Sequence, residues 1–373
     1  MEIIYSLLNV IKYLVYVLII LAILILAFVQ FSPVFGATPE KDSLRKMQQS
    51  KNFIDGKFIN LATTQVTTSS TKKNYPYLDF FIKPDEKNPS EPLPSIAFKS
   101  NKLAEGEFVW LGHSTLLMKT SGIVVMTDPV FNAASPIPII GKPFALENPI
   151  HIDDLPVVDV VVVISHDHYD HLDSKAIKAL SQRVGHFFVP LGVKAHLERW
   201  GVDQSKISEL NWFESENYRG IKFTLAPARH FSGRGLFDSN KTLWGSWIIT
   251  SEELNTYFSG DSGYSEIFKV IGQKFGPFDI VFMENGAYNE NWAQIHMLPE
   301  QTVQASIDLN AEVLFPIHWS KFDLSLHPWD EPIIRITQEA ARRDINIVTP
   351  MIGEIFDLDN LPKTPWWEAL RNK

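Results

Sequence analysis

Short hydrophobic runs separated by turn residues recur along the chain from residue 108 onward. Runs of four to eight residues rich in Val, Ile and Phe, bounded by Gly, Pro, Asn or Asp, are typical of β-strands. They predict strands at 108–111, 116–119, 123–126, 157–164, 186–189, 221–226, 244–250, 256–259, 280–284, 313–317 and 345–350. Apolar positions at helical spacing predict helices at 174–181, 192–200, 264–274, 299–309 and 331–343.

These strands form two clusters along the chain, each followed by helices. A mixed sheet that is covered by helices on one face must bury its other face. Two such sheets packed together, with helices outside, make a four-layer αββα sandwich, which is the α/β architecture predicted for residues 101–373. Residues 38–100 are polar and rich in Lys, Asn, Ser and Pro, and they predict an extended leader that packs on this body.

The N-terminal segment has a different pattern, because it is apolar on every face. Residues 13–29 are apolar throughout, and no charged side chain lies between Lys12 and Glu40. This approaches the roughly 20 residues that cross a bilayer. We therefore interpret residues 1–37 as a single-pass membrane anchor. A cleaved signal peptide is the alternative. The basic residues that follow favour a cytoplasmic body, whereas a signal peptide would place the body outside.

Composition limits the chemistry that this chain can perform. Its 373 residues are 45% hydrophobic, enough for a large core, and its net charge is -9. An acidic chain is poorly suited to bind the phosphate backbone, so we expect no nucleic-acid partner. The chain has no cysteine. Disulfides and thiolate metal sites are therefore excluded, and any metal must be held by histidine and carboxylate groups.

The segment VVVVISHDHYDHLD, residues 160–173, places a cluster of metal-ligand residue types directly after a predicted strand. His166, His168, Asp170 and His171 follow the spacing H-x-H-x-D-H. A loop at a sheet edge lets such side chains converge without burying unpaired charge in the core. Imidazole and carboxylate are the ligands of open, catalytic zinc sites. A solvated polar turn is the alternative, but four ligand types within six positions favour a metal site.

Three other predicted strands also end in a ligand-type residue. His230 follows the strand 221–226, Asp261 follows 256–259, and His318 follows 313–317. A single strand-end histidine is weak evidence. Their shared position, an apolar strand and then a ligand and a turn, predicts that they complete the same site.

The order of these residues resembles the metallo-β-lactamase superfamily of binuclear metallohydrolases, over about residues 108–356. Several words around them resemble the branch that contains N-acylphosphatidylethanolamine-hydrolysing phospholipase D. These words are WLGHST (110–115), TDP (127–129), SHDHYDHLD (165–173), PIHW (316–319) and HPW (327–329).

The resemblance implies two Zn²⁺ ions, or similar divalent metals, and assigns their ligands. His166, His168 and His230 would hold one ion, Asp170, His171 and His318 the other, and Asp261 would bridge both. A hydroxide shared by the two metals would be the nucleophile. Asp170 and Asp261 thus count among the expected catalytic residues as well as among the ligands.

Further residues near these motifs are candidates for supporting roles. His113 and His296 are expected to orient a ligand or to donate to substrate. The alternative for each is a hydrogen-bonded turn histidine, and His327 is a weaker case of the same kind. Asp128 and Asp173 are expected to orient the ligand histidines.

The resemblance implies a phospholipase D-type phosphodiesterase that acts on N-acylphosphatidylethanolamine or a related membrane phospholipid. An anchor at the bilayer would raise the effective concentration of such a substrate. A metal-dependent lactonase or sugar-phosphate lactonase is the main alternative. A nuclease and a β-lactamase are less favoured, and a non-catalytic, membrane-tethered binding protein is the alternative from another class. The oligomeric state stays open, a homodimer included.

Overall fold

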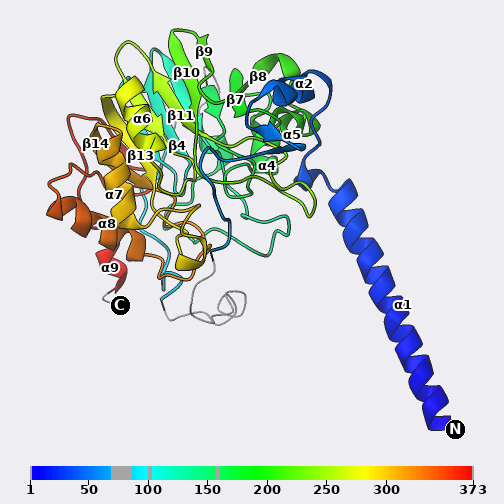
Figure 1. Ribbon diagram of the computed structural model, residues 1–373. Helices are drawn as coiled ribbons and strands as arrows, with labels where there is room; N and C mark the ends of the chain where they lie inside the picture. Colours follow the sequence, from blue (N-terminus) through cyan, green and yellow to red (C-terminus); the bar gives the residue numbers. More distant parts are fainter. Residues whose placement is uncertain (1, 69–85, 100–102, 156–159, 372–373) are drawn as a thin grey trace.

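The computed structural model describes residues 2–68, 86–99, 103–155 and 160–371 (Figure 1). Two mixed sheets dominate these residues. The first has seven strands in the order β15 (Ile355–Phe356), β3 (Phe108–Trp110), β4 (Leu116–Thr120), β5 (Ile123–Thr127), β6 (Val160–Val163), β7 (His186–Pro190) and β8 (Ile207–Leu210). The second has six, in the order β14 (Ala311–Ile317), β13 (Phe278–Glu284), β12 (Asn255–Phe258), β11 (Ser246–Thr250), β10 (Ile221–Ala226) and β9 (Ser215–Tyr218).

Helices cover the outer face of each sheet. The helices α4 (Ser174–Leu180) and α5 (Lys194–Arg199) lie beside the first sheet, and α6 (Ile267–Phe275), α7 (Pro299–Asp308) and α8 (Glu331–Arg342) lie on the side of the second (Figure 1). The predicted four-layer αββα sandwich is therefore confirmed. Shorter elements complete the body: 3-10 turns at Pro33–Phe35, Ile152–Asp154, Gln204–Lys206 and Glu290–Trp292, and the terminal helix α9 (Glu368–Arg371).

Strand β6 shows why the sequence around the metal motif is a continuous run of apolar residues. Val161 and Val163 pack in the cluster between the two sheets, whereas Val162 and Ile164 pack in the cluster beneath α4 and α5. Because alternate side chains point to opposite faces and both faces are covered, no polar alternation is left.

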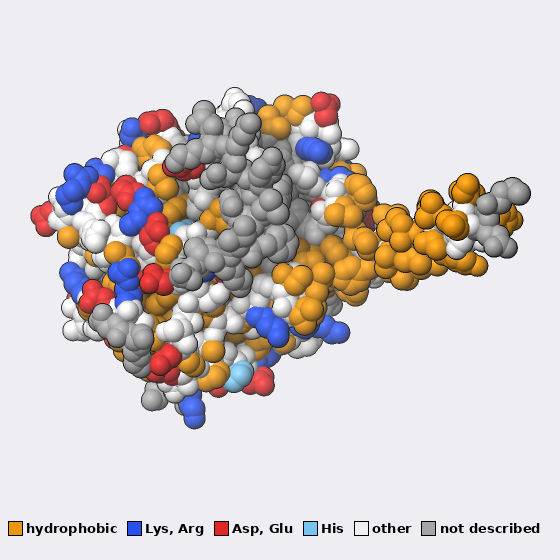
Figure 2. Space-filling view, turned by 90° about the horizontal axis from the view of Figure 1, so that it is seen from below, with side chains coloured by type: hydrophobic (Ala, Val, Ile, Leu, Met, Phe, Trp, Pro, Cys, Tyr) orange, Lys and Arg blue, Asp and Glu red, His pale blue; other side chains and the backbone are white. Residues whose placement is uncertain are grey.

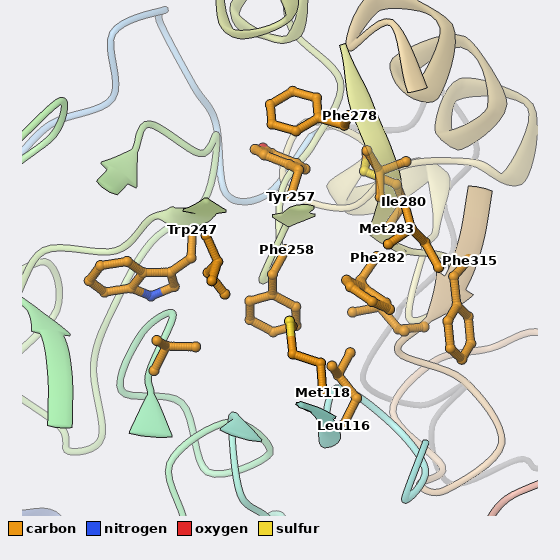
Figure 3. Close-up of a cluster of buried hydrophobic side chains, with 14 of the residues drawn as sticks. Leu116, Met118, Trp247, Tyr257, Phe258, Phe278, Ile280, Phe282, Met283 and Phe315 are labelled. Atoms are coloured by element: carbon orange, nitrogen blue, oxygen red, sulfur yellow. The ribbon is translucent and has the colours of Figure 1, made fainter. Parts of the chain in front are cut away.

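The main core lies between the two sheets. Figure 3 shows Leu116 and Met118 of β4 beside Phe258 and Phe282 of the second sheet. Elsewhere in the same layer, Phe188 of β7 stacks on Phe223 of β10 with ring centroids 4.3 Å apart. These contacts fix one sheet against the other, and with them the strand ends that approach each other at the edge of the sandwich.

Two parts of the sequence prediction are wrong. Residues 345–350 form only a bridge, between Ile347 and Leu314. The leader is not extended throughout, since it contains helix α2 (Lys41–Gln49) and the hairpin of β1 (Phe53–Ile54) and β2 (Lys57–Phe58). Helix α2 buries only Met47, so its sequence lacks the apolar stripe from which a helix is predicted. Part of the leader, residues 69–85, lies outside the described residues.

The apolar N-terminal segment forms the long helix α1 (Glu2–Phe31), which projects away from the body (Figure 1). Its described stretch Ile3–Phe31 is long and apolar enough to cross a membrane, and none of its most apolar window is buried against the rest of the chain. A signal sequence near the N-terminus would pass the same test of length and composition.

Candidate metal centre

The predicted ligand residues meet at one edge of the sandwich. The loop after β6, residues 165–173, is called the metal loop below; it carries four of them. The loops after β10, β12 and β14 carry His230, Asp261 and His318. Five of the seven are buried, and His168 and Asp170 are partly exposed. The sandwich thus gathers residues that are up to 152 positions apart, from His166 to His318.

Two groups of donor atoms form within this cluster. In the first, His168 Nδ1 lies 2.9 Å from His166 Nε2 and 3.2 Å from His230 Nε2. In the second, His318 Nε2 lies 3.1 Å from His171 Nε2, and both lie 3.4 Å from Asp170 Oδ2. Ligands about 2.0–2.1 Å from a tetrahedral zinc ion lie about 3.3 Å from one another. Both groups are close to the size of one metal shell.

Asp261 lies between the two groups and directs one oxygen to each. Its Oδ1 is 3.1 Å from His171 Nε2 and 3.0 Å from His318 Nε2. Its Oδ2 is 3.7 Å from His230 Nε2 and 3.9 Å from His166 Nε2. One carboxylate thus faces both groups of donor atoms.

The charge and hydrogen bonding of the cluster fit a cation. Asp261 Oδ1 is buried and, among the described residues, makes no well-oriented hydrogen bond despite its two close imidazole nitrogens. Burial alone raises the pKa of a carboxyl group, but His171 and His318 hold the pKa of Asp261 well below its usual range. Burial alone would lower the pKa of His318, but Asp261 and Asp170 raise it to about 10. The pocket therefore favours positive charge between these donors, which supports a divalent metal.

Neighbouring groups fix the orientation of the imidazole rings. Nδ1 of His171 donates to Asp128 Oδ2 at 2.7 Å, and Asp128 also accepts from the backbone N–H and the hydroxyl of Ser165 at 2.7 and 2.6 Å. Nδ1 of His230 donates to the carbonyl of Ile295 at 2.9 Å. In both rings Nε2 is left to face the site, which is the arrangement that metal-binding histidines use.

His113 and His296 both reach the cluster. His113 Nε2 lies 3.1 Å from Asp170 Oδ2. His296 Nδ1 lies 2.9 Å from Glu284 Oε2, so its Nε2 remains for the site. Three non-glycine residues here have positive φ, namely His113 at 55°, Asp128 at 33° and His318 at 67°. Such strained backbone concentrates at functional sites.

Two of the candidate residues have other roles. Asp173 makes no hydrogen bond to a site histidine within the described residues. Instead its Oδ1 caps α4 by accepting from the backbone of Lys175 and Ala176, so the expectation that it orients a ligand is wrong. His327 donates from Nδ1 to the carbonyl of Pro328 and stacks on Tyr288, as a turn histidine does.

The sequence reasoning missed two residues that shape the site. Glu284 ends β13 and is fully buried beside His296, and its position at a strand end was the available signal. Asn60, in the leader, exchanges hydrogen bonds with the backbone of His230 at 2.7 and 3.1 Å. No local sequence pattern predicts the contact between Asn60 and His230, which are 170 positions apart.

A buried arginine connects the metal loop to the end of α1. The guanidinium of Arg234 donates to the carbonyls of Asp167 at 2.6 Å and Leu172 at 2.8 Å, both in the metal loop. It also donates twice to the carbonyl of Val34, at 3.0 and 3.1 Å. Its planar group lies 4.1 Å from the ring of Tyr169. We call this set of contacts the Arg234 brace.

Comparisons with known proteins identify the family. The family model described as "Beta-lactamase superfamily domain" matches residues 124–319. A Mycobacterium tuberculosis protein of uncharacterised function is 38% identical over 332 residues, covering 86% of this chain and 88% of the relative. The N-acyl-phosphatidylethanolamine-hydrolyzing phospholipase D 1 of Caenorhabditis elegans is 35% identical over 266 residues, covering 66% of this chain and 74% of the relative. The solved isothiocyanate hydrolase from Delia radicum gut bacteria has a similar fold, with a TM-score of 0.52 at 19% identity over 67% of this chain and 98% of that one.

The fold and the cluster of histidine and aspartate side chains are thus those of a known class of metal-dependent hydrolases. The chain belongs to the metallo-β-lactamase superfamily, and it is a hydrolase of the metal-dependent kind. Within the superfamily it resembles the branch of N-acylphosphatidylethanolamine-hydrolysing phospholipases D.

Proposed function

We propose that this protein is a phospholipase D-type phosphodiesterase that uses two Zn²⁺ ions to hydrolyse N-acylphosphatidylethanolamine or a related membrane phospholipid. The observation that carries the proposal is the position of Asp261, whose two oxygens face separate groups of histidines. The 35% identity to the Caenorhabditis elegans phospholipase supports the choice of substrate.

In this proposal His166, His168 and His230 hold one ion, Asp170, His171 and His318 hold the other, and Asp261 contacts both. Bound metal ions would activate water and polarise the phosphoryl oxygens. The chain itself supplies the ring orientation, through Asp128 for His171 and through the carbonyl of Ile295 for His230.

His113 and His296 are proposed to act on the substrate. Each lies at the edge of the donor cluster, and His296 has its Nδ1 occupied by Glu284. Nε2 of His296 is then the atom available to a phosphoryl or leaving-group oxygen. Replacing His296 with Gln should lower kcat while the metal content stays at the wild-type value; an equal loss of metal would show that it acts through the metal shell instead.

The helix α1 is proposed to be an uncleaved, single-pass anchor. Its 30 residues span about 45 Å at 1.5 Å per residue, which exceeds the bilayer hydrocarbon core of about 30 Å. The segment that follows it, up to Ala37, is hydrogen-bonded to the body through the Arg234 brace and through His196 Nδ1, which accepts from the N–H of Ala37 at 2.9 Å. Intact mass of the purified protein distinguishes the retained anchor from a cleaved signal peptide.

The test of the function is a substrate panel on the full chain loaded with zinc. Phospholipids including N-acylphosphatidylethanolamine, soluble phosphodiesters and lactones are compared, and metal analysis is expected to give about two zinc ions per chain. Asp261→Ala should abolish turnover. Activity on lactones alone would assign the protein to the lactonases, and absence of turnover with metal bound would favour a binding protein.

A further inference from the structure

The chain leaves α1 in a fixed direction, because the end of the helix is bound to the body. Arg199 donates to the carbonyl of Phe31 at 3.2 Å, and the indole N–H of Trp200 donates to the carbonyl of Pro33 at 2.7 Å. The ring of Phe35 packs against Phe28 in the last turns of α1, with centroids 5.3 Å apart. The surface of the body around this exit is therefore held close to the medium in which the helix lies.

Two loops on that face expose large apolar side chains. In the loop 135–141, Ile137, Ile139 and Ile140 are 42%, 77% and 55% exposed. In the loop 235–238, Leu236 and Phe237 are 62% and 73% exposed. We call these five side chains the basal surface. Single exposed apolar residues are ordinary, but several of them grouped in two loops on one face indicate an interaction site.

Both loops lie beside the exit of α1. Leu236 and Phe237 line a cleft of about 260 Å³ together with Val29 and Gln30, which belong to the last turns of the helix. The loop 135–141 borders a second cleft, of about 490 Å³, that is also lined by Ser32 to Val34. Figure 2 shows hydrophobic side chains continuing from the helix onto the adjoining part of the body.

We propose that the basal surface inserts into the lipid bilayer around α1, so that the body rests on the membrane with the metal loop next to it. The proposal rests on the proposed role of α1 as an anchor. A bilayer is favoured over a protein partner because the two loops border separate clefts at the helix exit. A membrane surrounds the helix on all sides, whereas a single protein would have to enclose its base.

Charge at the edge of the basal surface is complementary to an anionic bilayer. Lys142 and Lys175 line the cleft beside the loop 135–141, and Arg199 and Lys241 line the other. The acidic Asp238 lies in the second loop, but its carboxylate accepts from the backbone N–H groups of Arg234 and Gly235 and so is turned into its own loop. Lysine and arginine next to inserted apolar side chains are typical of interfacial membrane binding.

The proposed surface is adjacent to the chemistry. Asp167 of the metal loop lines the first cleft, and Tyr169 and Asp173 of the same loop line the second. A body that rests on these loops holds its metal loop at headgroup depth, where a phosphodiester of a membrane lipid lies. The lipid then has to move only a short way out of the bilayer to reach the site.

The test uses the lack of cysteine in the full chain. Phe237→Cys and Ile139→Cys are each labelled with an environment-sensitive fluorophore, and the zinc-loaded protein is reconstituted in vesicles of phosphatidylcholine and phosphatidylglycerol. Nitroxide-labelled phosphatidylcholine serves as the quencher. Val270→Cys, on α6 and 47% exposed, is the matched control away from α1, and Leu18→Cys reports the helix itself.

We expect blue-shifted and quenched emission at positions 139 and 237 and neither effect at position 270. Quenching at position 18 without quenching at 139 and 237 would overturn the basal surface and leave the anchor intact. A blue shift that lipid nitroxide does not quench would mean that protein, such as a second copy, covers the loops, which also overturns the proposal. Quenching at 139 and 237 without any at 18 would also overturn the proposal, because the loops would then enter a bilayer that α1 does not cross.

Activity separates this proposal from the proposed function. The double variant Ile139→Ser/Phe237→Ser should hydrolyse vesicle phospholipid several-fold more slowly than wild type, while its rate on a soluble phosphodiester stays unchanged. Equal loss on both substrates would contradict a docking role. If the wild-type protein hydrolysed neither substrate, the function would fail while the quenching result still decided the surface.

Discussion

Asp128→Asn changes one buried atom next to the metal loop while keeping the size of the side chain. In the wild type, Oδ1 accepts from the backbone N–H of Ser165, and Oδ2 accepts from Ser165 Oγ and from His171 Nδ1. An asparagine has one oxygen and one NH₂ group. In either orientation its NH₂ faces a group that donates in the wild type, so a buried donor of Ser165 or His171 loses its acceptor.

The expected magnitude follows from that lost acceptor. A buried polar group without a partner costs about 1–3 kcal/mol of unfolding free energy. Loss of the carboxylate that orients a ligand histidine typically lowers metal affinity about 10–100-fold. For zinc this corresponds to about 1.4–2.8 kcal/mol of binding free energy. The variant should therefore lose zinc affinity and apo-protein stability by comparable amounts.

The assay is competition for zinc between the full-length protein and a chromogenic chelator, together with thermal unfolding of the metal-free form. Asp173→Asn is the matched control. Asp173 is also buried in the metal loop and also loses an acceptor as asparagine, but its Oδ1 caps α4 and its Oδ2 accepts from the backbone N–H groups of Phe131 and Asn132, not from a ligand histidine. Its zinc affinity should equal that of the wild type.

Wild-type zinc affinity in Asp128→Asn would refute the reasoning, because it would show that His171 is oriented without the carboxylate. An equal loss in both variants would also refute it, since the cause would then be a general loosening of the metal loop.

Three further perturbations test other parts of the molecule. Arg234→Met removes the Arg234 brace and should lower the unfolding free energy in detergent by about 3–5 kcal/mol, because hydrogen bonds to buried carbonyls are lost. The control, Arg335→Met at a surface ion pair, should lower it by no more than about 1 kcal/mol. Similar denaturation curves for the two variants would contradict the stabilising role of the brace. Burial lowers the pKa of Lys321 to about 7, whereas a lysine in the unfolded chain has a pKa near 10.4. Between pH 7 and pH 10 the native chain therefore binds fewer protons than the unfolded chain. The unfolding free energy of the wild type should then rise by about 2 kcal/mol from pH 7 to pH 9 because of this group. Lys321→Met should remove that rise and Lys119→Met should keep it, as followed by chemical denaturation at both pH values. Chelation of the metals should lower the unfolding temperature and added zinc should restore it, because Asp170 and Asp261 lose their counter-charge; a chelated protein that melts at the same temperature as the loaded one would speak against a metal between them.

Much of the fold was predictable because each sheet packs on the other sheet with one face and is covered by helices on its other face. Its inner strands are therefore apolar runs that stand out in the sequence. Strand β10 was predicted at the bounds that it has, since its apolar residues are flanked by Gly220 and Pro227. The strand at 345–350 failed because an apolar run says nothing of its partner, and only Ile347 finds one. Strands β8 and β9 were missed because they lie at sheet edges, where β9 is largely polar and β8 has only two apolar residues among four.

The site was predictable where residue type and strand end coincide, as in the metal loop and at His318. It was not predictable where a contact joins distant segments. Asn60 meets His230 across 170 positions, and Glu284 meets His296 around a turn that has no motif. Asp173 both follows His171 by two positions and precedes a helix, so the sequence alone does not separate an orienting role from a capping one.

The Arg234 brace has a consequence for the order of events during synthesis. It joins Val34 to a residue 200 positions later in the chain. A ribosome that adds about 5–20 residues per second needs about 10–40 s to cover that distance. During this time α1 has left the ribosome and can enter the membrane, while Arg234, which binds the carbonyl of Val34 in the folded protein, has not yet been synthesised. In the proposed anchor role, α1 would thus enter the membrane before the body folds against its end, and Arg234 would then join the helix end and the metal loop in one step.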